Sequence, residues 1–279
     1  MSKYKGPILL MVTNLSYMVS HSLTKYLAAF LPVSELMFVR FIFGPLLLLP
    51  FFLSGRFNFE VKRWWLIGLR TFFGITAMFG YFWALKLGDP GKVSLIFQCS
   101  SLWVLIIAKF LFKDSPTWQT KISIPIAFFG LWLVLRPENL FALAVPDLLA
   151  FLASFINAGV LLSLKDLRRD HGSNSIMFAN YGLSSAITGV WMIPEFVMPS
   201  SLSLGLIVLC MGVVGFIGNL CMTIGFKYAS ASVASNLMLL LVPLMYISGI
   251  LFFGESIDPL SIVGVSVVLG ALGVISIYQ

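Results

Sequence analysis

Long apolar segments separated by short polar turns run through the whole chain. Turn-forming residues stand between the segments, for example in Gly88-Asp89-Pro90-Gly91 and in Arg136-Pro137. A helix that crosses the hydrocarbon core of a membrane needs about 20 apolar residues, and most segments approach that length. The pattern therefore predicts an all-α membrane protein with ten transmembrane helices, at residues 7–30, 34–53, 64–86, 91–112, 121–136, 146–166, 174–194, 203–226, 231–253 and 260–278.

The second half of the chain repeats the first half weakly. Residues 80–135 have an echo in residues 218–276, and the central parts of the two segments align without a gap. Each copy reads as the end of an apolar helix, a short turn with one Lys, a long apolar helix, an acidic turn and a final apolar helix. In a hydrophobic chain such a duplication is typical of transporters. We expect one repeat of five helices at residues 1–138 and a second at residues 139–279.

The distribution of basic residues predicts the orientation in the membrane. With the N-terminus in the cytoplasm, eleven Lys and Arg residues fall on the inner side and only three, Lys86, Lys92 and Arg136, on the outer side. Both termini are then cytoplasmic. Because five helices per repeat is an odd number, the second repeat enters the membrane upside down. Inverted repeats place a substrate site near the middle of the bilayer and allow alternating access.

Several motifs resemble a known family. Arg40 lies in VRFIFGPLLLLP, and the run Lys227-Tyr228-Ala229-Ser230-Ala231-Ser232-Val233-Ala234 leads to Pro243, with Gly254-Glu255 after it. With Ala84-Leu85-Lys86 in the first half, the whole chain resembles the EamA-like branch of the drug/metabolite transporter superfamily. The resemblance implies ten helices, a central cavity lined by helices one to four and six to nine, and helices five and ten at the periphery.

The first repeat departs from the family pattern. Leu102 stands where the second repeat has Pro243, and Asp114 stands where it has Glu255. We therefore expect the fourth helix to be straighter than the ninth. Within the family, the chain is similar to members described as S-adenosylmethionine uptake proteins.

Composition excludes several classes of function. The chain of 279 residues is 59% hydrophobic and 10% charged, whereas soluble domains carry about 25% charge. Ten helices leave no room for a soluble domain, and no G-x-x-x-x-G-K-[ST] motif for ATP is present. The net charge of +7 fits orientation in a membrane better than binding of nucleic acid. The three cysteines have no metal-like spacing, and no cofactor is expected.

Polar side chains recur on single faces of the predicted helices. Such groups are costly in a bilayer and usually face the protein interior. They can join helices through hydrogen bonds, but four polar faces together predict a polar cavity. Glycines 212, 215 and 218 of the eighth helix instead indicate close helix packing. The polar candidates for substrate binding are Asn14, Tyr17, His21, Gln98, Ser101, Asn157, Asn180, Ser184, Asn219 and Asn236.

Arg40 and Arg70 lie about two turns inside their predicted helices. They could form a clamp for a substrate carboxylate or phosphate, or make structural contacts to helix-end carbonyls or to Glu35. No Asp or Glu lies deep in any span. His21 is therefore the deep group suited to carry protons near neutral pH, although exchange or facilitated flow would need no such carrier.

Aromatic residues are dense in the third helix. They could form a stacking wall for a planar or cationic substrate, or face lipid and the membrane interface. The ring candidates are Phe79, Tyr81, Trp83, Trp103 and Tyr246.

These features predict a secondary transporter in the bacterial inner membrane. It would move a small amino-acid- or nucleoside-like metabolite, with S-adenosylmethionine as one candidate, by alternating access. A drug or amino-acid exporter of the same family is the alternative. An intramembrane enzyme is a distant one, because no nucleophile–base pair is visible. The expected partners are a small-molecule substrate and the lipid bilayer, with no nucleic acid; a homodimer stays open.

Overall fold

The protein is a set of α-helices joined by short connections, as seen in a computed structural model. The structure describes residues 5–55, 59–100, 102–104, 106–107, 118–135, 144–228, 237–238, 240–255 and 259–278. Within these ranges every regular element is helical. The elements are α1 Lys5–Leu27, α2 Val33–Leu53, α3 Trp64–Leu87, α4 Pro90–Gln98, α6 Trp118–Leu135, α7 Val145–Asp170, α8 Ser173–Met192, the short 3₁₀ helix η1 Ile193–Glu195, α9 Leu202–Tyr228, α11 Leu241–Phe253 and α12 Pro259–Tyr278.

Five stretches of helix are long and apolar enough to cross a membrane. They are α2, α3, α7, α8 together with η1, and α9. Two shorter apolar helices are α11 and the first part of α12, Pro259–Ala271. The chain is therefore a multi-pass integral membrane protein. Ten crossings, their inverted arrangement and cytoplasmic termini stay predictions.

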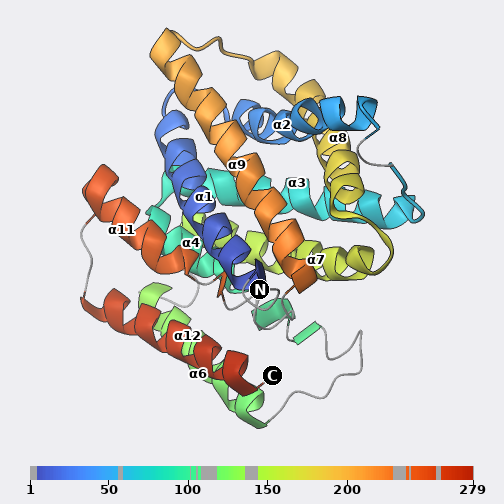
Figure 1. The fold of residues 1–279 in the computed structure, drawn as a ribbon. Helices are drawn as coiled ribbons and strands as arrows, with labels where there is room; N and C mark the ends of the chain where they lie inside the picture. The colour runs from blue at the N-terminus through green and yellow to red at the C-terminus, as the bar shows by residue number, and fades with distance from the viewer. Residues whose placement is uncertain are drawn as a thin grey trace.

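Helices of the first half pack mainly against helices of the second half (Figure 1). The pairs are α1 with α9, α2 with α8, α3 with α7, α4 with α11, and α6 with α12. If each helix is replaced by the corresponding helix of the other half, the pairs α1–α9 and α3–α7 exchange, and the other three pairs are unchanged. In the view of Figure 1, α6 and α12 lie together at the lower edge. The fold therefore depends on contacts between the halves.

Glycines permit the close approach of α9 to its neighbours. A Cβ atom on Gly212 would lie 2.3 Å from the ring of Phe43 in α2, and one on Gly218 would lie 2.9 Å from the ring of Tyr17 in α1. A Cβ on Gly215 would also come within 2.8 Å of a side-chain atom of α2. The predicted packing role of these three glycines is confirmed.

The fourth helix, which the sequence predicts to be straighter than the ninth, is interrupted. α4 ends at Gln98, and Cys99 lies in a turn. The Cys99 N–H donates to the Ile96 carbonyl at 3.1 Å, and the Leu102 N–H donates to the Cys99 carbonyl at 2.9 Å. This three-residue spacing is that of a tighter 3₁₀ turn. The interruption therefore forms without the proline that the second repeat has at this place.

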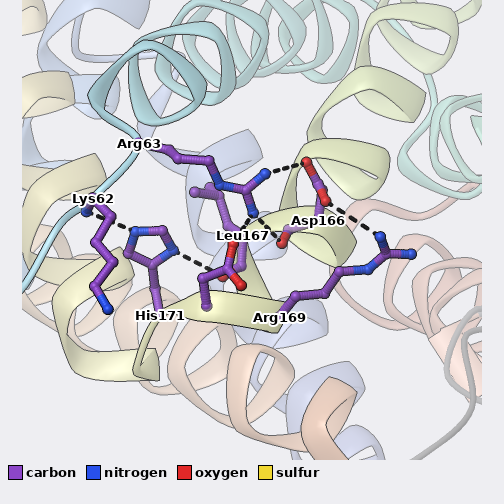
Figure 2. A network of polar contacts seen from close by, with 7 residues as sticks. Lys62, Arg63, Asp166, Leu167, Arg169 and His171 are labelled. Atoms are coloured by element: carbon purple, nitrogen blue, oxygen red, sulfur yellow. Dashed lines mark hydrogen bonds and ion pairs between the residues drawn. The ribbon is translucent and has the colours of Figure 1, made fainter.

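A polar network joins the start of α3 to the end of α7 (Figure 2). Arg63 lies just before α3, and its guanidinium contacts Asp166 at 2.8 Å and Asp170 at 2.6 Å. The Lys62 N–H donates to Nε2 of His171 at 2.9 Å. These contacts fix one pair of helix ends.

A second group of polar contacts lies at the other end of α7. Lys92 of α4 forms an ion pair of 2.7 Å with Asp147, near the start of α7. Arg169 lies near the end of this helix of 26 residues, which is about 39 Å long. Lys92 and Arg169, which the predicted topology assigns to opposite sides of the bilayer, are therefore far apart.

Candidate functional site

A central cavity of about 100 Å³ lies between the helices of the two halves. Side chains from α1, α2, α3, α4, α7, α8, α9 and α11 line it. The wall is mostly apolar, with a few polar groups, as is usual for small-molecule sites. The cavity brings together nine of the candidates: Tyr17, His21, Arg40, Arg70, Tyr81, Gln98, Asn157, Asn180 and Asn219.

A column of rings forms one wall of this cavity. The rings of Tyr17 and His21 are stacked with centroids 5.3 Å apart, which follows from their separation by four residues on α1. The ring of Tyr81 from α3 meets His21 edge-on at 4.9 Å. The Tyr81 hydroxyl also contacts Nδ1 of His21 at 3.0 Å and the Ser94 hydroxyl of α4 at 2.9 Å. This chain of contacts links α1, α3 and α4 and fixes the orientation of the imidazole.

Two arginines contribute the charge of the cavity. Arg40 donates from Nη1 to the Ser20 hydroxyl at 2.9 Å, and its guanidinium lies 5.3 Å from the ring centroid of Tyr17. Arg70 donates from Nη1 to the carbonyl of Val160 in α7 at 3.0 Å. The Nε atom of each arginine is buried without a protein partner. The ion pairs between described residues include no contact of Arg40 with Glu35, although the sequence allowed one.

Two amide side chains contact backbone carbonyls shortly before α11. Gln98 donates to the carbonyl of Met238, and Asn14 donates to the carbonyl of Leu237 at 2.7 Å. Both carbonyls precede α11, which begins at Leu241. The Leu237 carbonyl also accepts from the Leu240 N–H at 3.2 Å, so that Asn14 adds a second hydrogen bond to it. Gln98 lines the cavity, whereas the buried Asn14 is not among the lining residues that the structure describes.

Three asparagines add neutral polar groups to the cavity. Asn157 of α7 donates to the Ser100 hydroxyl at 3.1 Å, and Asn180 of α8 accepts from the Thr71 hydroxyl at 3.2 Å. Oδ1 of Asn219 in α9 is buried without a protein partner. The amides can both donate and accept hydrogen bonds.

Two of the predicted rings face a different depression. Phe79 and Trp83 line a hollow of about 450 Å³ near the end of α3. The ring of Trp191 packs on Phe79 at 4.8 Å, and Nζ of Lys86 lies 5.3 Å from the ring centroid of Trp83. Neither ring lines the central cavity, and their role in stacking on a substrate stays a prediction.

Other candidates have contacts elsewhere or lie outside the described residues. Trp103 donates to the Ser154 hydroxyl at 3.0 Å. Ser184 is buried outside the cavity wall, and the ring of Tyr246 covers Gly91 at the start of α4. Two further candidates, Ser101 and Asn236, fall outside the described part of the chain.

The sequence prediction missed Tyr181. This residue of α8 is completely buried, lines the cavity and has a hydroxyl without a protein partner. Its ring packs edge-on against Phe41 at 5.4 Å. The sequence did contain a signal for this residue, because Tyr181 directly follows the candidate Asn180 in an apolar segment.

Glu255 lies in the connection after α11, outside the membrane-spanning segments. Its pKa is raised to about 7, first by burial and then by the nearby Asp89 carboxylate. The Lys25 ammonium and a hydrogen bond from the Gly91 N–H act in the opposite direction. Through the hydrogen bond from the Gly91 N–H, Glu255 connects the end of α11 to the start of α4.

Comparisons with known proteins agree with this fold. Residues 4–136 and 145–277 each match the EamA-like transporter family. The chain is similar to the pseudopaline exporter CntI of Pseudomonas aeruginosa, with 21% identity over 93% of this chain and 91% of the relative. It is also similar to an S-adenosylmethionine uptake transporter of Rickettsia felis, with 30% identity over 42% of this chain and 40% of the relative.

A solved crystal structure supports the same architecture. It covers 99% of this chain and 100% of its own chain with a TM-score of 0.72, at 16% sequence identity. At this identity the likeness concerns the fold alone. The match to the family extends over both halves, and the chain belongs to the EamA-like transporter family.

Proposed function

We propose that the chain is a secondary transporter that carries a small amino-acid-like metabolite with an acidic group across a bacterial inner membrane. The central cavity is the observation that supports this function best. It collects buried polar side chains of several helices around Arg40 and Arg70. Ionisable residues inside a membrane are costly and usually mark a substrate or ion pathway. The cavity is the place where both arginines meet the other polar groups.

Ten helices in two inverted repeats, with both termini in the cytoplasm, would give this cavity access to both sides. The pairing of helices across the halves is preserved when the halves are exchanged, which favours this arrangement. Lys92 contacts Asp147 near the start of α7, whereas Arg169 lies near the end of α7. This separation of the two basic residues also favours the inverted arrangement. In inverted repeats one bundle rocks against the other around a central site.

The size of the cavity favours a closed stage of that cycle. Its volume of about 100 Å³ is below the ~300–1,000 Å³ of pockets for drug-sized ligands. The helices must therefore separate before a metabolite of that size can enter.

A reconstitution experiment tests the function. The purified full-length protein is placed in liposomes with a mixture of amino acids, nucleosides, organic acids, S-adenosylmethionine and lipophilic cations on one side, and mass spectrometry follows each compound. Both loading directions are needed, because one relative is named an exporter and another an uptake transporter. We expect at least one compound to cross the membrane unchanged.

A matched pair of variants connects transport to the cavity. The combined substitutions Tyr17→Ala and Gln98→Ala should abolish transport, since both side chains line the cavity. Trp132→Ala removes a half-exposed ring of α6 outside the cavity and should have little effect. Full transport by the double variant, or movement of no compound by the wild-type protein, would contradict the proposal. Chemical conversion of a compound would favour an intramembrane enzyme instead.

A further inference from the structure

The two cavity arginines are buried cations without an anionic partner. Arg40 is 1% exposed and Arg70 is 2% exposed. The ion pairs of the described ranges all lie at or beyond helix ends, and none includes either arginine. A buried charge without a counter-charge is strongly unfavourable. The protein therefore keeps two cations where a compensating anion would be expected.

The contacts within the protein use only part of each guanidinium. A guanidinium has five N–H donors, and both Nε atoms lack a protein partner. Arg40 donates to the Ser20 hydroxyl, and its guanidinium lies 5.3 Å and 5.9 Å from the ring centroids of Tyr17 and Phe82. Arg70 contacts the Val160 carbonyl. Aromatic faces and a carbonyl reduce the cost of burying a cation, but they do not neutralise it.

The two arginines stand against different walls of the cavity. Arg40 projects from α2 toward α1, whose Ser20 accepts its hydrogen bond, whereas Arg70 projects from α3 toward α7. Each guanidinium can therefore bind its own acidic group in the bidentate geometry that suits carboxylates.

The remaining lining residues add no negative charge. None of the cavity-lining residues that the structure describes is Asp or Glu. The uncharged amides of Asn157, Asn180 and Asn219 are among the side-chain donors and acceptors that line the cavity with the arginines. A substrate with two acidic groups would balance the two guanidinium charges. A cation such as S-adenosylmethionine, whose sulfonium and ammonium groups outweigh its single carboxylate, would add to them.

We propose that the cavity binds a small organic acid with two separate anionic groups, one at Arg40 and the other at Arg70. This assignment rests on the proposed transport function and specifies its substrate class. The neutral part of the acid would lie between the arginines, along the ring of Tyr17 and the amides of α7, α8 and α9.

A binding assay on the full-length protein in detergent tests the assignment. The probes are a homologous series of short α,ω-dicarboxylates, each paired with its monoamide, which has the same shape and one charge fewer. Glycerol phosphate and S-adenosylmethionine complete the set. For at least one chain length, the dicarboxylate should bind about tenfold more tightly than its monoamide, which corresponds to the loss of one charge-assisted contact.

Variants identify the groups responsible. Arg40→Gln and Arg70→Gln should each abolish the preference for the dicarboxylate, so that the diacid and its monoamide bind about equally, because one charged contact is then missing. Arg40→Lys and Arg70→Lys keep the charge and should restore part of the preference. Arg169→Gln removes an arginine at the end of α7 and should leave the preference for the dicarboxylate unchanged. Elution as a single species in gel filtration checks that each variant is folded.

Several outcomes would overturn the assignment. They are equal binding of every diacid and its monoamide, tightest binding of glycerol phosphate or S-adenosylmethionine, or an unchanged preference in both Gln variants. If liposomes carrying the protein transport another compound while no diacid is preferred, the substrate class is wrong and the transport function stands. If no compound crosses the membrane at all, the proposed function itself fails.

Discussion

The Glu255→Gln variant should resist rising pH better than the wild-type protein. The Glu255 carboxyl has its pKa raised to about 7, first by burial and then by Asp89. A carboxyl whose pKa is raised on folding holds its proton more tightly in the folded state than in the unfolded state. The stability that it contributes is therefore fully present below its ordinary pKa of 4.5 and is lost as the pH rises through about 7.

The expected size of the effect follows from the same pKa. The rise from 4.5 to about 7 corresponds to about 3 kcal/mol of unfolding free energy, at ~1.4 kcal/mol for each tenfold change in proton affinity. Because the side chain is only half-buried, solvent screening reduces this to on the order of 1–2 kcal/mol. One kcal/mol changes the melting temperature of a chain of this size by about 2–4 °C. The variant should therefore gain roughly 2–8 °C over the wild-type protein between about pH 5 and about pH 8.

Thermal unfolding of the detergent-purified proteins at a series of pH values measures this difference. Titratable groups that do not interact with Glu255 affect both proteins equally, so that the difference between their melting temperatures reports on this carboxyl and its neighbours Asp89 and Lys25. Glu60→Gln is the matched control, because Glu60 also lies in a connection but has a side chain that is 69% exposed. The control should follow the wild-type curve. Parallel curves for the wild-type protein and Glu255→Gln would refute the reasoning.

Two further predictions concern helix contacts. Gly44→Ala would place a Cβ atom 2.3 Å from Cβ of the buried Tyr181 and should cost at least about 1–3 kcal/mol by overpacking, whereas Gly182→Ala has open space and should gain about 0.5–1 kcal/mol. Equal melting temperatures for the two variants would contradict the close contact of α2 with α8. A double-mutant cycle of Arg63→Ala and Asp166→Ala should give a coupling energy of about 1 kcal/mol for their 2.8 Å ion pair; a value of zero would mean that this pair does not join α3 to α7.

Hydrophobic length predicts most helix positions in this chain. The expected span 64–86 corresponds to α3, Trp64–Leu87, and the expected span 203–226 corresponds to α9, Leu202–Tyr228. They agree because the thickness of the bilayer sets the length of an apolar segment. The interruption at Cys99 has no such signal, because it consists of backbone hydrogen bonds in a segment without proline.

The site is predictable where polar groups are costly. Tyr17, His21 and Arg70 are candidates because each lies within an apolar segment, and all three line the cavity. Aromatic residues give no comparable signal, because their rings suit lipid, the interface and a cavity equally well. For that reason the sequence does not indicate that Phe79 lies at a different hollow or that Tyr181 lines the cavity.

Pairing of helices across the halves has a consequence for biosynthesis. Arg70 and Lys92 are made early, but the Val160 carbonyl and the Asp147 carboxylate that they contact belong to α7, which is made later. Until α7 enters the bilayer, the newly inserted first half has two cations that cannot reach these partners. We expect it to be a target for membrane proteases if synthesis stops there. Two separately encoded halves should mature only when the same cell makes both.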